Sequence, residues 1–359
     1  MKYISICIIL TNGPEKLPRC LDSIETQDFD DYEVIIVDST GYRFTLEMEE
    51  QLSGIADCYG KSHGMDIRYA FVPSEYGKLE AVRKAVMKAD GLYFLMLEPG
   101  DILCTGALSS LHDISNPDHP DIVQGNIRCN MIPEPDAQED SDVMDGLERL
   151  EKLVNAGRKG LLLEDDILDE FLSAGSSRGC LMGRIMRTEL MLSSLSMLPV
   201  QYAVHGYDYL IYFSVAYLAR SFLGTDLDVY EMNIGEDVST ERRISSLRDW
   251  EQICLASSLY SSIYGLLKRF GKDLTDEEYV RIEEQSYFHL VQGIIDLEKS
   301  VSEEMRPQAW EMLRSFWGDD VFDSVLVDLC NKGILDLKSW DFPLSFDADM
   351  TSDGYNMIN

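Results

Sequence analysis

The chain has 359 residues, of which 45% are hydrophobic, so it can form a substantial core in one large or two ordinary domains and is not a disordered chain. Its 64 acidic residues outnumber 31 basic ones and give a formal net charge of −33. This balance argues against partners that need an extended basic surface, namely nucleic acid and anionic membranes. A site for a phosphorylated ligand would therefore depend on a few local cations or on a metal.

The cysteines and the apolar runs bear on where the protein works. Its eight cysteines are scattered without a CxxC pair or a zinc-like spacing, and several lie in apolar strand patterns, which indicates buried thiols in a reducing compartment. The chain starts with an apolar strand and shows no signal peptide. The longest apolar run, residues 209–218, is shorter than the roughly 20 residues that cross a bilayer. We therefore expect a cytoplasmic protein without a transmembrane segment.

The first third of the chain alternates between apolar strands and amphipathic helices. Strands are expected at residues 4–10, 33–37, 67–72, 92–98 and 121–125, with helices at 17–27, 45–58, 78–89 and 107–114. This alternation predicts an α/β fold with a mostly parallel sheet and crossover helices. The sequence has no GxGxxG after the first strand and no GxxxxGK[ST], so neither a dinucleotide site nor a P-loop is indicated.

The alternation ends beyond Asn126. We expect a loop at residues 133–142, helices at 145–156, 161–172 and 209–222, and strands at 180–186 and 228–232. Amphipathic helices are then expected at residues 247–267, 276–299, 305–316 and 321–330. The sequence thus predicts a domain over residues 1–240, a helical C-terminal region over 241–340 and a polar tail over 341–359.

The chain turns sharply at Glu98-Pro99-Gly100-Asp101, directly after its most apolar strand. Proline fixes φ at the first turn position and glycine accepts a positive φ at the second. Glu98 and Asp101 are thereby placed at the carboxyl edge of the sheet, where ligands bind in open α/β folds. Two carboxylates there could hold a divalent metal and, through it, a diphosphate. Alternatively, Glu98 is solvated and Asp101 caps a helix that begins near Thr105.

Several segments, in collinear order over roughly residues 3–240, resemble the family-2 glycosyltransferases, which are inverting enzymes with a GT-A fold. The opening ISICIILTNGPEKLPRCLDSIETQ is similar to that family's first strand, turn and helix. DYEVIIVDSTG resembles its second strand, and GKLEAVRKAVMKADGLYFLMLEPGDIL resembles the helix and strand that lead to the DxD metal motif. DIVQGNI, GCLMGRIMRTEL and HGYDYLIYFSVAYLARS resemble the following strand, the acceptor-side strand and the helix that starts with a Glu-Asp pair.

The resemblance implies roles for individual residues. Asp38 would lie in the nucleoside pocket, near the uracil or ribose, and Thr11 would also contact the nucleotide sugar. Arg83 would approach the diphosphate. Asp208 would be the base that takes the proton of the acceptor hydroxyl. Each of the three charged residues also has a structural interpretation, which is a turn residue for Asp38, a solvated or ion-paired helix residue for Arg83, and the N-cap of the next helix for Asp208.

Two further roles concern the metal motif. By the same resemblance, Asp101 would bind Mg²⁺ or Mn²⁺, and Glu98 would contact the nucleotide sugar and help to hold the metal. The sequence leaves open whether a metal is needed, because Lys78, Arg83 and Lys84 could take its place near the diphosphate.

This sequence departs from the family pattern at each of these positions. The usual D-x-D-D reads Glu98-Pro99-Gly100-Asp101, the Glu-Asp pair reads Tyr207-Asp208, and the acidic doublet after the second strand reads Asp38-Ser39. An acid nevertheless survives at each. We therefore expect a glycosyltransferase that moves a sugar from a nucleotide-sugar donor, which we expect to be UDP-linked, to a glycan or surface-polysaccharide acceptor.

Two alternatives stay open. One is a catalytically retired pseudo-glycosyltransferase, a binding or scaffold module whose C-terminal helices serve a protein partner or self-association; the lost motif residues favour it. The other is a nucleotidyltransferase, which would want a glycine-rich, basic loop after the first strand, and Thr11-Asn12-Gly13-Pro14 does not supply one.

Overall fold

A computed structural model of the chain describes residues 2–41, 45–131, 141–157, 159–172, 179–200, 202, 206–234, 244 and 246–333. Within these residues nine strands form one mixed sheet, in the order β3-β2-β1-β4-β8-β6-β9-β5, with β7 paired to β9. The strands are β1 (Ile4–Leu10), β2 (Tyr32–Asp38), β3 (Ile67–Phe71), β4 (Tyr93–Met96), β5 (Ile102–Leu103), β6 (Ile122–Met131), β7 (Gly160–Leu163), β8 (Arg184–Arg187) and β9 (Ser221–Ile234). The predicted α/β class is confirmed.

The sheet is parallel where the sequence alternates most regularly. β3, β2, β1 and β4 run parallel to one another, whereas β8 lies antiparallel between β4 and β6. β6 and β9 then pair in parallel, and β5 and β7 each pair antiparallel with β9. The sheet is therefore parallel in its first half and mixed in its second half.

Helices cover both faces of the sheet, because successive side chains of a strand point to opposite faces. Ile6 and Ile8 of β1 share a core with the first face's helices, α1 (Leu17–Glu25), α2 (Leu46–His63) and α4 (Ala107–Ser115). Cys7 and Ile9 share a core with the second face's helices, which are α3 (Gly77–Val86), α6 (Asp165–Leu172), α7 (Thr188–Met197) and α8 (Tyr207–Leu218). Short 3₁₀ turns precede α1 and α3, at η1 (Pro14–Lys16) and η2 (Ser74–Tyr76).

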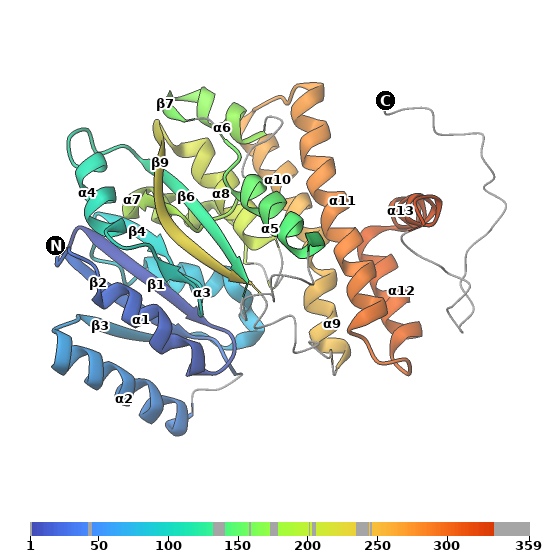
Figure 1. Cartoon of the computed structure of the whole chain (residues 1–359). Coiled ribbons are helices and arrows are strands. Elements are labelled where there is room, and N and C mark those ends of the chain that lie inside the picture. Colours follow the sequence, from blue (N-terminus) through green and yellow to red (C-terminus); the bar gives the residue numbers. More distant parts are fainter. Residues whose placement is uncertain are drawn as a thin grey trace.

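The C-terminal helices gather on the side of the molecule away from β3 and α2 (Figure 1). They are α9 (Leu247–Cys254), α10 (Ala256–Phe270), α11 (Asp276–Lys299), α12 (Arg306–Trp317) and α13 (Asp319–Asn331). Leu259 and Ile263 of α10 belong to the same core as α8, whereas Trp250, Trp310 and Phe322 centre a separate core. The predicted domain boundary near residue 240 thus stays a prediction, since α10 packs into the core on the second face of the sheet.

Predicted element bounds fail where a distant strand decides the local structure. The helix expected at 161–172 is strand β7 followed by α6, because Gly160–Leu163 pairs with β9 and Glu164 adopts a positive φ of 52°. The helix expected at 209–222 begins at Tyr207 and ends at Leu218, since Phe222 belongs to β9 and pairs with Ile122. Strands expected at 121–125 and 228–232 extend further, as β6 and β9.

The remaining differences from the predicted elements are small. The helix expected at 247–267 is two helices, α9 and α10, which meet at Leu255. The strand expected at 180–186 is β8, at Arg184–Arg187, and no sequence pattern predicts the two-residue strand β5. The tail at 341–359 and all but the last two residues of the loop at 133–142 lie outside the described residues. All eight cysteines are thiols. Across the described ranges, we find no helix with the length and apolarity that a membrane span requires.

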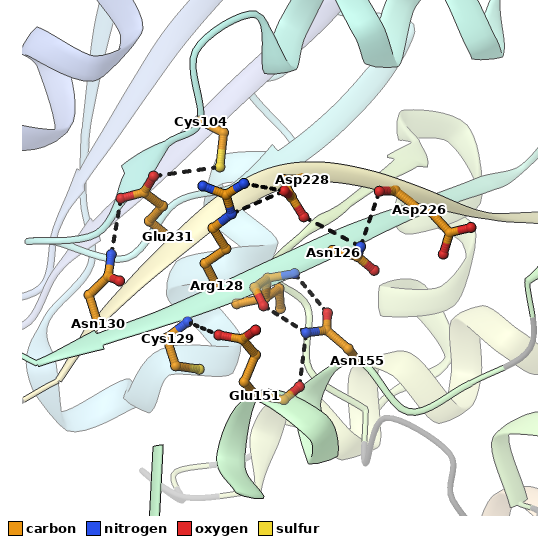
Figure 2. Close-up of polar contacts among 11 residues, drawn as sticks. Cys104, Asn126, Arg128, Cys129, Asn130, Glu151, Asn155, Asp226, Asp228 and Glu231 are labelled. Carbon is orange, nitrogen blue, oxygen red and sulfur yellow. Dashed lines mark hydrogen bonds and ion pairs between the residues drawn. The ribbon is translucent and has the colours of Figure 1, made fainter. Parts of the chain in front are cut away.

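Side chains of α5 (Ser141–Val154) and the residue after it complete the outer edge of β6 (Figure 2). The side chain of Asn155 accepts a hydrogen bond from the Ile127 N–H at 2.7 Å and donates to the Ile127 carbonyl at 2.6 Å, as a neighbouring strand would. Glu151 accepts from the Cys129 N–H at 2.8 Å. β6 is thereby held in place as the support for β9, which carries residues of the candidate site.

Candidate functional site

β1, β2 and β4 end at one edge of the sheet because they run in parallel. Leu10 is level with Asp38, so Thr11 follows β1 beside the end of β2. Asp38 is buried, and its Oδ1 accepts hydrogen bonds from the Thr40 N–H at 3.0 Å and the Thr40 hydroxyl at 2.7 Å. This is the turn role that the sequence offered as the structural interpretation of Asp38. Its contact with a nucleoside stays a prediction, as does that of half-buried Thr11, and both lie at the edge where such a ligand would bind.

The Glu98–Asp101 turn forms as predicted, directly after β4. The Asp101 N–H donates to the Glu98 carbonyl at 3.1 Å, and Gly100 has a φ of 94°, which a side chain would strain. Cys20 of α1 fixes the turn, since its sulfur accepts from the Gly100 N–H at 3.2 Å and donates to the Glu98 carbonyl at 3.4 Å. Burial raises the pKa of the Cys20 thiol to about 12, so this side chain acts as a thiol and not as a thiolate.

Asp101 is held by β9 and does not cap α4, whose N-cap is Gly106. The Tyr230 hydroxyl donates to Asp101 Oδ2 at 2.6 Å, and the Asn233 N–H donates to Asp101 Oδ1 at 2.8 Å. The residue is only 6% exposed, and this burial raises its pKa to about 6 against the effect of both hydrogen bonds. Asp101 therefore connects the turn to the distant strand β9.

Tyr230 and Asn233 also reach the turn directly. The Glu98 N–H donates to the Tyr230 oxygen at 3.0 Å, and the Asn233 side chain donates to the Gly100 carbonyl at 2.8 Å. Tyr230 is fully buried, and this burial raises its pKa well above the usual value, so its hydroxyl keeps its proton. The turn is thus fixed from both sides, by Cys20 of α1 and by two residues of β9.

The Glu98 side chain points to a lysine and a tyrosine. Lys78, in the first turn of α3, places its ammonium 3.3 Å from Glu98 Oε2 and 3.4 Å from Oε1. The Tyr207 hydroxyl donates to Glu98 Oε1 at 3.1 Å, and Lys78 Nζ lies 5.6 Å from the centre of the Tyr207 ring. The lysine and the glutamate keep 23% and 20% of their side chains exposed, so a ligand at the sheet edge can reach both.

Asp208 stands in the first turn of α8, next to this group. The N-cap of α8 is Gly206, with a φ of 73°, so the alternative role of Asp208 as the N-cap is wrong. Burial raises the pKa of Asp208 to about 6; the N–H groups of Tyr209 and of Asp208 itself and the ammonium of Lys78 oppose the rise, and the charge of Glu98 adds to it. A carboxyl with this pKa accepts a proton more readily than an ordinary aspartate and is still ionised at pH 7.

Arg83 is engaged elsewhere. Its guanidinium donates to both oxygens of Glu80 at 3.1 Å and to the carbonyl oxygens of Leu195 and Leu198 at the end of α7, the latter at 3.3 Å. These bonds join α3 to α7 and match the structural interpretation of Arg83. Its contact with a diphosphate stays a prediction, which this placement does not favour.

Two exposed tyrosines lie near the start of α3, which carries Lys78. Tyr76 and Tyr202 are each 41% exposed, with ring centres 6.2 Å apart. A Cβ on Gly77 would lie 3.1 Å from the main chain of Tyr202, so glycine permits this approach. Arg248 of α9 forms an ion pair with Glu75 at 2.6 Å, which ties the C-terminal helices to the same turn.

The residues present do not fit a divalent metal at the predicted position. Both oxygens of Asp101 already accept hydrogen bonds, and Glu98 faces an ammonium that would repel a second cation. The middle acid of the family's motif is replaced by Gly100, where an added Cβ would meet Lys16 Cδ at 3.2 Å. No group of three metal-ligating side chains converges anywhere in the part of the chain that the structure describes. The predicted Mg²⁺ or Mn²⁺ therefore lacks the ligand set that the resemblance implied.

Sequence signals are weak for the residues that complete the site. The sequence marks Lys78 only as one of three cations that could replace a metal, and Tyr207 only as the residue that replaces the first acid of the Glu-Asp pair. Asn233 binds the Glu98–Asp101 turn through its main-chain N–H and its side chain. No local signal marks Tyr230 or Cys20, because their partners lie 129 and 80 residues away along the chain.

Comparisons with known proteins agree with this fold. Residues 5–159 match the family described as Glycosyl transferase family 2. The crystal structure of S. aureus TarS 1-349 aligns over 93% of this chain and 92% of its own, with a TM-score of 0.51 and 16% identity, which shows a shared fold.

Two further structures align more loosely. TarS in complex with UDP-GlcNAc gives a TM-score of 0.49 at 18% identity, over 93% and 92% of the two chains. The mannosyltransferase PcManGT from Pyrobaculum calidifontis, in complex with GDP-Man and Mn²⁺, gives 0.46 at 11% identity, over 92% and 80%. Among curated proteins none matches this chain.

Proposed function

On the premise that residues 5–159 form a glycosyl transferase family 2 domain, we propose that the chain moves a sugar from a UDP-linked donor to a glycan acceptor, with inversion at the anomeric carbon. The observation that carries this proposal is the gathering of Lys78, Glu98, Tyr207 and Asp208 at the carboxyl edge of the sheet. These residues supply a cation, Lys78, and a buried carboxylate, Asp208, at the edge where α/β folds bind ligands.

In this proposal the donor lies across the ends of β1, β2 and β4. Its nucleoside occupies the space beside Thr11 and Asp38, at the ends of β1 and β2. Its diphosphate faces the Glu98–Asp101 turn and the ammonium of Lys78. Tyr76 and Tyr202 are exposed near the start of α3 and offer aromatic faces to the acceptor glycan.

Transfer then needs a base on the far side of the sugar from the diphosphate. The acceptor hydroxyl attacks the anomeric carbon while Asp208 takes its proton; the bond from that carbon to the diphosphate oxygen breaks, and the nucleoside diphosphate leaves with the electron pair. The raised pKa of Asp208, about 6, suits this role near neutral pH. One carboxylate thus accounts for the proton, and the leaving group takes the negative charge.

We further propose that residues 1–240 form the transferase unit and that the helices of 241–340 support it. Leu259 of α10 lies close to Gly206, at the start of the helix that carries Asp208. Arg248 and Glu75 add an ion pair between α9 and η2. The helices would thereby fix the position of the base. A surface-polysaccharide acceptor would approach from the carboxyl edge of the sheet.

A second candidate is a retired enzyme that only binds a ligand or a partner, with the C-terminal helices as the partner surface. The observation that favours it is that Asp101 uses both carboxylate oxygens to bind β9, and Glu98 is paired within the protein. Acids that serve the fold in this way are also what a scaffold would retain.

Calorimetric titration of the full chain with UDP, UDP-glucose and their GDP equivalents, with and without Mn²⁺, tests the proposal. We expect one nucleotide class to bind. We also expect the protein to hydrolyse the matching nucleotide-sugar donor slowly, which releases the nucleoside diphosphate. Binding without any such release supports the retired enzyme. Absence of binding for every nucleotide, in both conditions, contradicts the proposed function.

A further inference from the structure

The position that the family uses for a metal is occupied here by a lysine and its carboxylate partner. Glu98 stands at the first acid of the metal motif, yet its side chain is directed to the ammonium of Lys78 and to the hydroxyl of Tyr207. Gly100 stands at the middle acid, and Lys16 covers the space that a side chain there would enter. The last acid, Asp101, is buried against β9.

These changes belong together physically. A divalent cation bound by Glu98 would lie beside an ammonium held 3.3 Å from the same carboxylate, and the two like charges would repel. An acid at position 100 would require both a φ of 94° and displacement of Lys16. The site is therefore arranged around a lysine and leaves no set of oxygen ligands for a metal among the described residues.

We propose that the ammonium of Lys78 takes the place of the metal and binds the diphosphate of the nucleotide donor directly, with Glu98 as a positioning residue. This rests on the proposed function, since it names the group that holds the donor of that reaction. The exposed part of the lysine lies at the carboxyl edge, where the diphosphate is expected.

The geometry of the ion pair suits this exchange. An ammonium has three N–H donors, and charge-assisted bonds to a carboxylate are usually about 2.7–2.9 Å long. The distances of 3.3 and 3.4 Å to Glu98 are longer, so the pair is loose and a phosphate oxygen can compete for the ammonium. Tyr207 keeps Glu98 in place through its own hydrogen bond of 3.1 Å. Glu98 thus positions the ammonium of Lys78 without binding it tightly.

The other two cations that the sequence offered in place of a metal are placed differently. Arg83 is bonded to Glu80 and to the end of α7. Lys84 is exposed further along α3, directly after Arg83. Of the three cations that the sequence offered in place of a metal, Lys78 is the one that contacts the Glu98–Asp101 turn in the described structure.

Titration of UDP into the full chain, in EDTA and in Mn²⁺, distinguishes a diphosphate held by Lys78 from a diphosphate held by a metal. We expect the same dissociation constant, within about twofold, in both conditions. Lys78→Gln should weaken binding at least tenfold in EDTA, whereas Lys78→Arg should retain most of it because the charge remains. Lys88→Gln, which removes the same charge from an exposed position after α3, should change the constant less than twofold.

Glu98→Gln should change the affinity for UDP in opposite directions, depending on whether Glu98 positions Lys78 or binds a metal. If Glu98 only positions Lys78, the neutral amide keeps an acceptor for Tyr207 and removes a negative charge that competes with the diphosphate, so UDP should bind equally or more tightly in EDTA. If Glu98 is a metal ligand, the variant should lose Mn²⁺-dependent binding. Thermal unfolding of each variant shows whether the fold is kept; if Lys78→Gln does not fold, Lys78→Arg, Glu98→Gln and the titration in EDTA still decide.

Binding that disappears in EDTA, or that Lys78→Gln leaves unchanged, would overturn the assignment of Lys78 while the proposed function stands. Failure of every nucleotide to bind in both conditions would overturn the proposed function and this assignment together.

Discussion

Two acid-rich regions of the molecule look alike in composition but differ in burial. One, the edge cluster, consists of Lys78, Glu98, Asp101, Tyr207 and Asp208. The other, the ribbon cluster, lies across β6 and β9 and consists of Asn126, Arg128, Asp226, Asp228 and Glu231 (Figure 2). The residue types in the two are similar, but it is the edge cluster that lies at the carboxyl ends of the parallel strands.

Their electrostatics follow from that difference. In the ribbon cluster Arg128 forms an ion pair with Asp228, and their side chains are 55% and 37% exposed. The hydrogen bond from Arg128 to Asp228 raises the pKa of the arginine, which is charged in either case. In the edge cluster burial raises the pKa values of Asp101 and Asp208 to about 6. Burial at the edge of a parallel sheet, more than the presence of acids, therefore marks a site for chemistry.

The largest contrast should come from removing one aspartate in each cluster. Asp208→Asn should lower the release of UDP from a UDP-sugar donor by about 10²–10⁴-fold, the range for a general base, while UDP binds within about twofold of wild type. Asp228→Asn in the ribbon cluster is the matched control and should leave both unchanged. Steady-state kinetics and calorimetry measure the two effects. Equal losses in both variants would remove the distinction between the clusters.

Tyr230→Phe should destabilise the protein more than an exposed substitution of the same kind. The hydroxyl joins the Glu98 N–H to Asp101, and its loss leaves both groups without that partner in a buried place, at a cost of about 1–3 kcal/mol in the free energy of unfolding. Tyr279→Phe, on a side chain that is 50% exposed, is the control. Urea unfolding measures both, and a Tyr230→Phe effect no larger than that of the control would show that Asp101 does not depend on β9.

The free energy of unfolding should increase on acidification because Asp101 of the edge cluster is buried. A carboxyl whose folded pKa is raised from 3.8 to about 6 binds protons more readily when folded, so its contribution favours folding below pH 4 and is lost as pH rises through 6. Between pH 7 and 4.5, Asp101 should add about 1–2 kcal/mol to the free energy of unfolding. Wild type should therefore gain more on acidification than Asp101→Asn. An equal gain in the two proteins would contradict the buried state of Asp101.

The smallest effect should follow from breaking the ion pair of the ribbon cluster. Its members are exposed, and exposed pairs contribute little because water screens their charges. Arg128→Gln should shift the thermal midpoint by less than Tyr230→Phe does and leave donor binding unchanged. Differential scanning calorimetry checks the first point. A shift as large as that of Tyr230→Phe would mean that the ribbon cluster supports the fold as strongly as the edge cluster does.

The first half of the fold could be predicted closely from the sequence, because its elements depend on local patterns. The strand at 4–10 and the turn at Glu98–Asp101 form where apolar runs and the Pro-Gly pair predict them. The second half depends on pairing between segments far apart. Leu161 and Phe222 belong to strands because β7 and β9 pair with each other and β9 pairs with β6, and no local pattern shows this.

The candidate site divides in the same way. The resemblance brought Glu98, Asp101 and Asp208 to notice, and the structure places them at one edge of the sheet. The resemblance could not predict that Glu98 faces Lys78 or that Asp101 faces Tyr230, since these contacts depend on how α3 and β9 pack against the turn. The departures at Gly100 and Tyr207, which looked like losses in the sequence, have partners in the folded protein.

A crystal structure of the full chain with UDP bound in the presence of EDTA tests the central claim most directly. The account predicts that the diphosphate lies at the carboxyl ends of β1 and β4, within hydrogen-bond distance of Lys78 Nζ, with Glu98 still beside the lysine. Nucleotide bound away from this edge, or bound there only when Mn²⁺ is coordinated by Asp101, would contradict it.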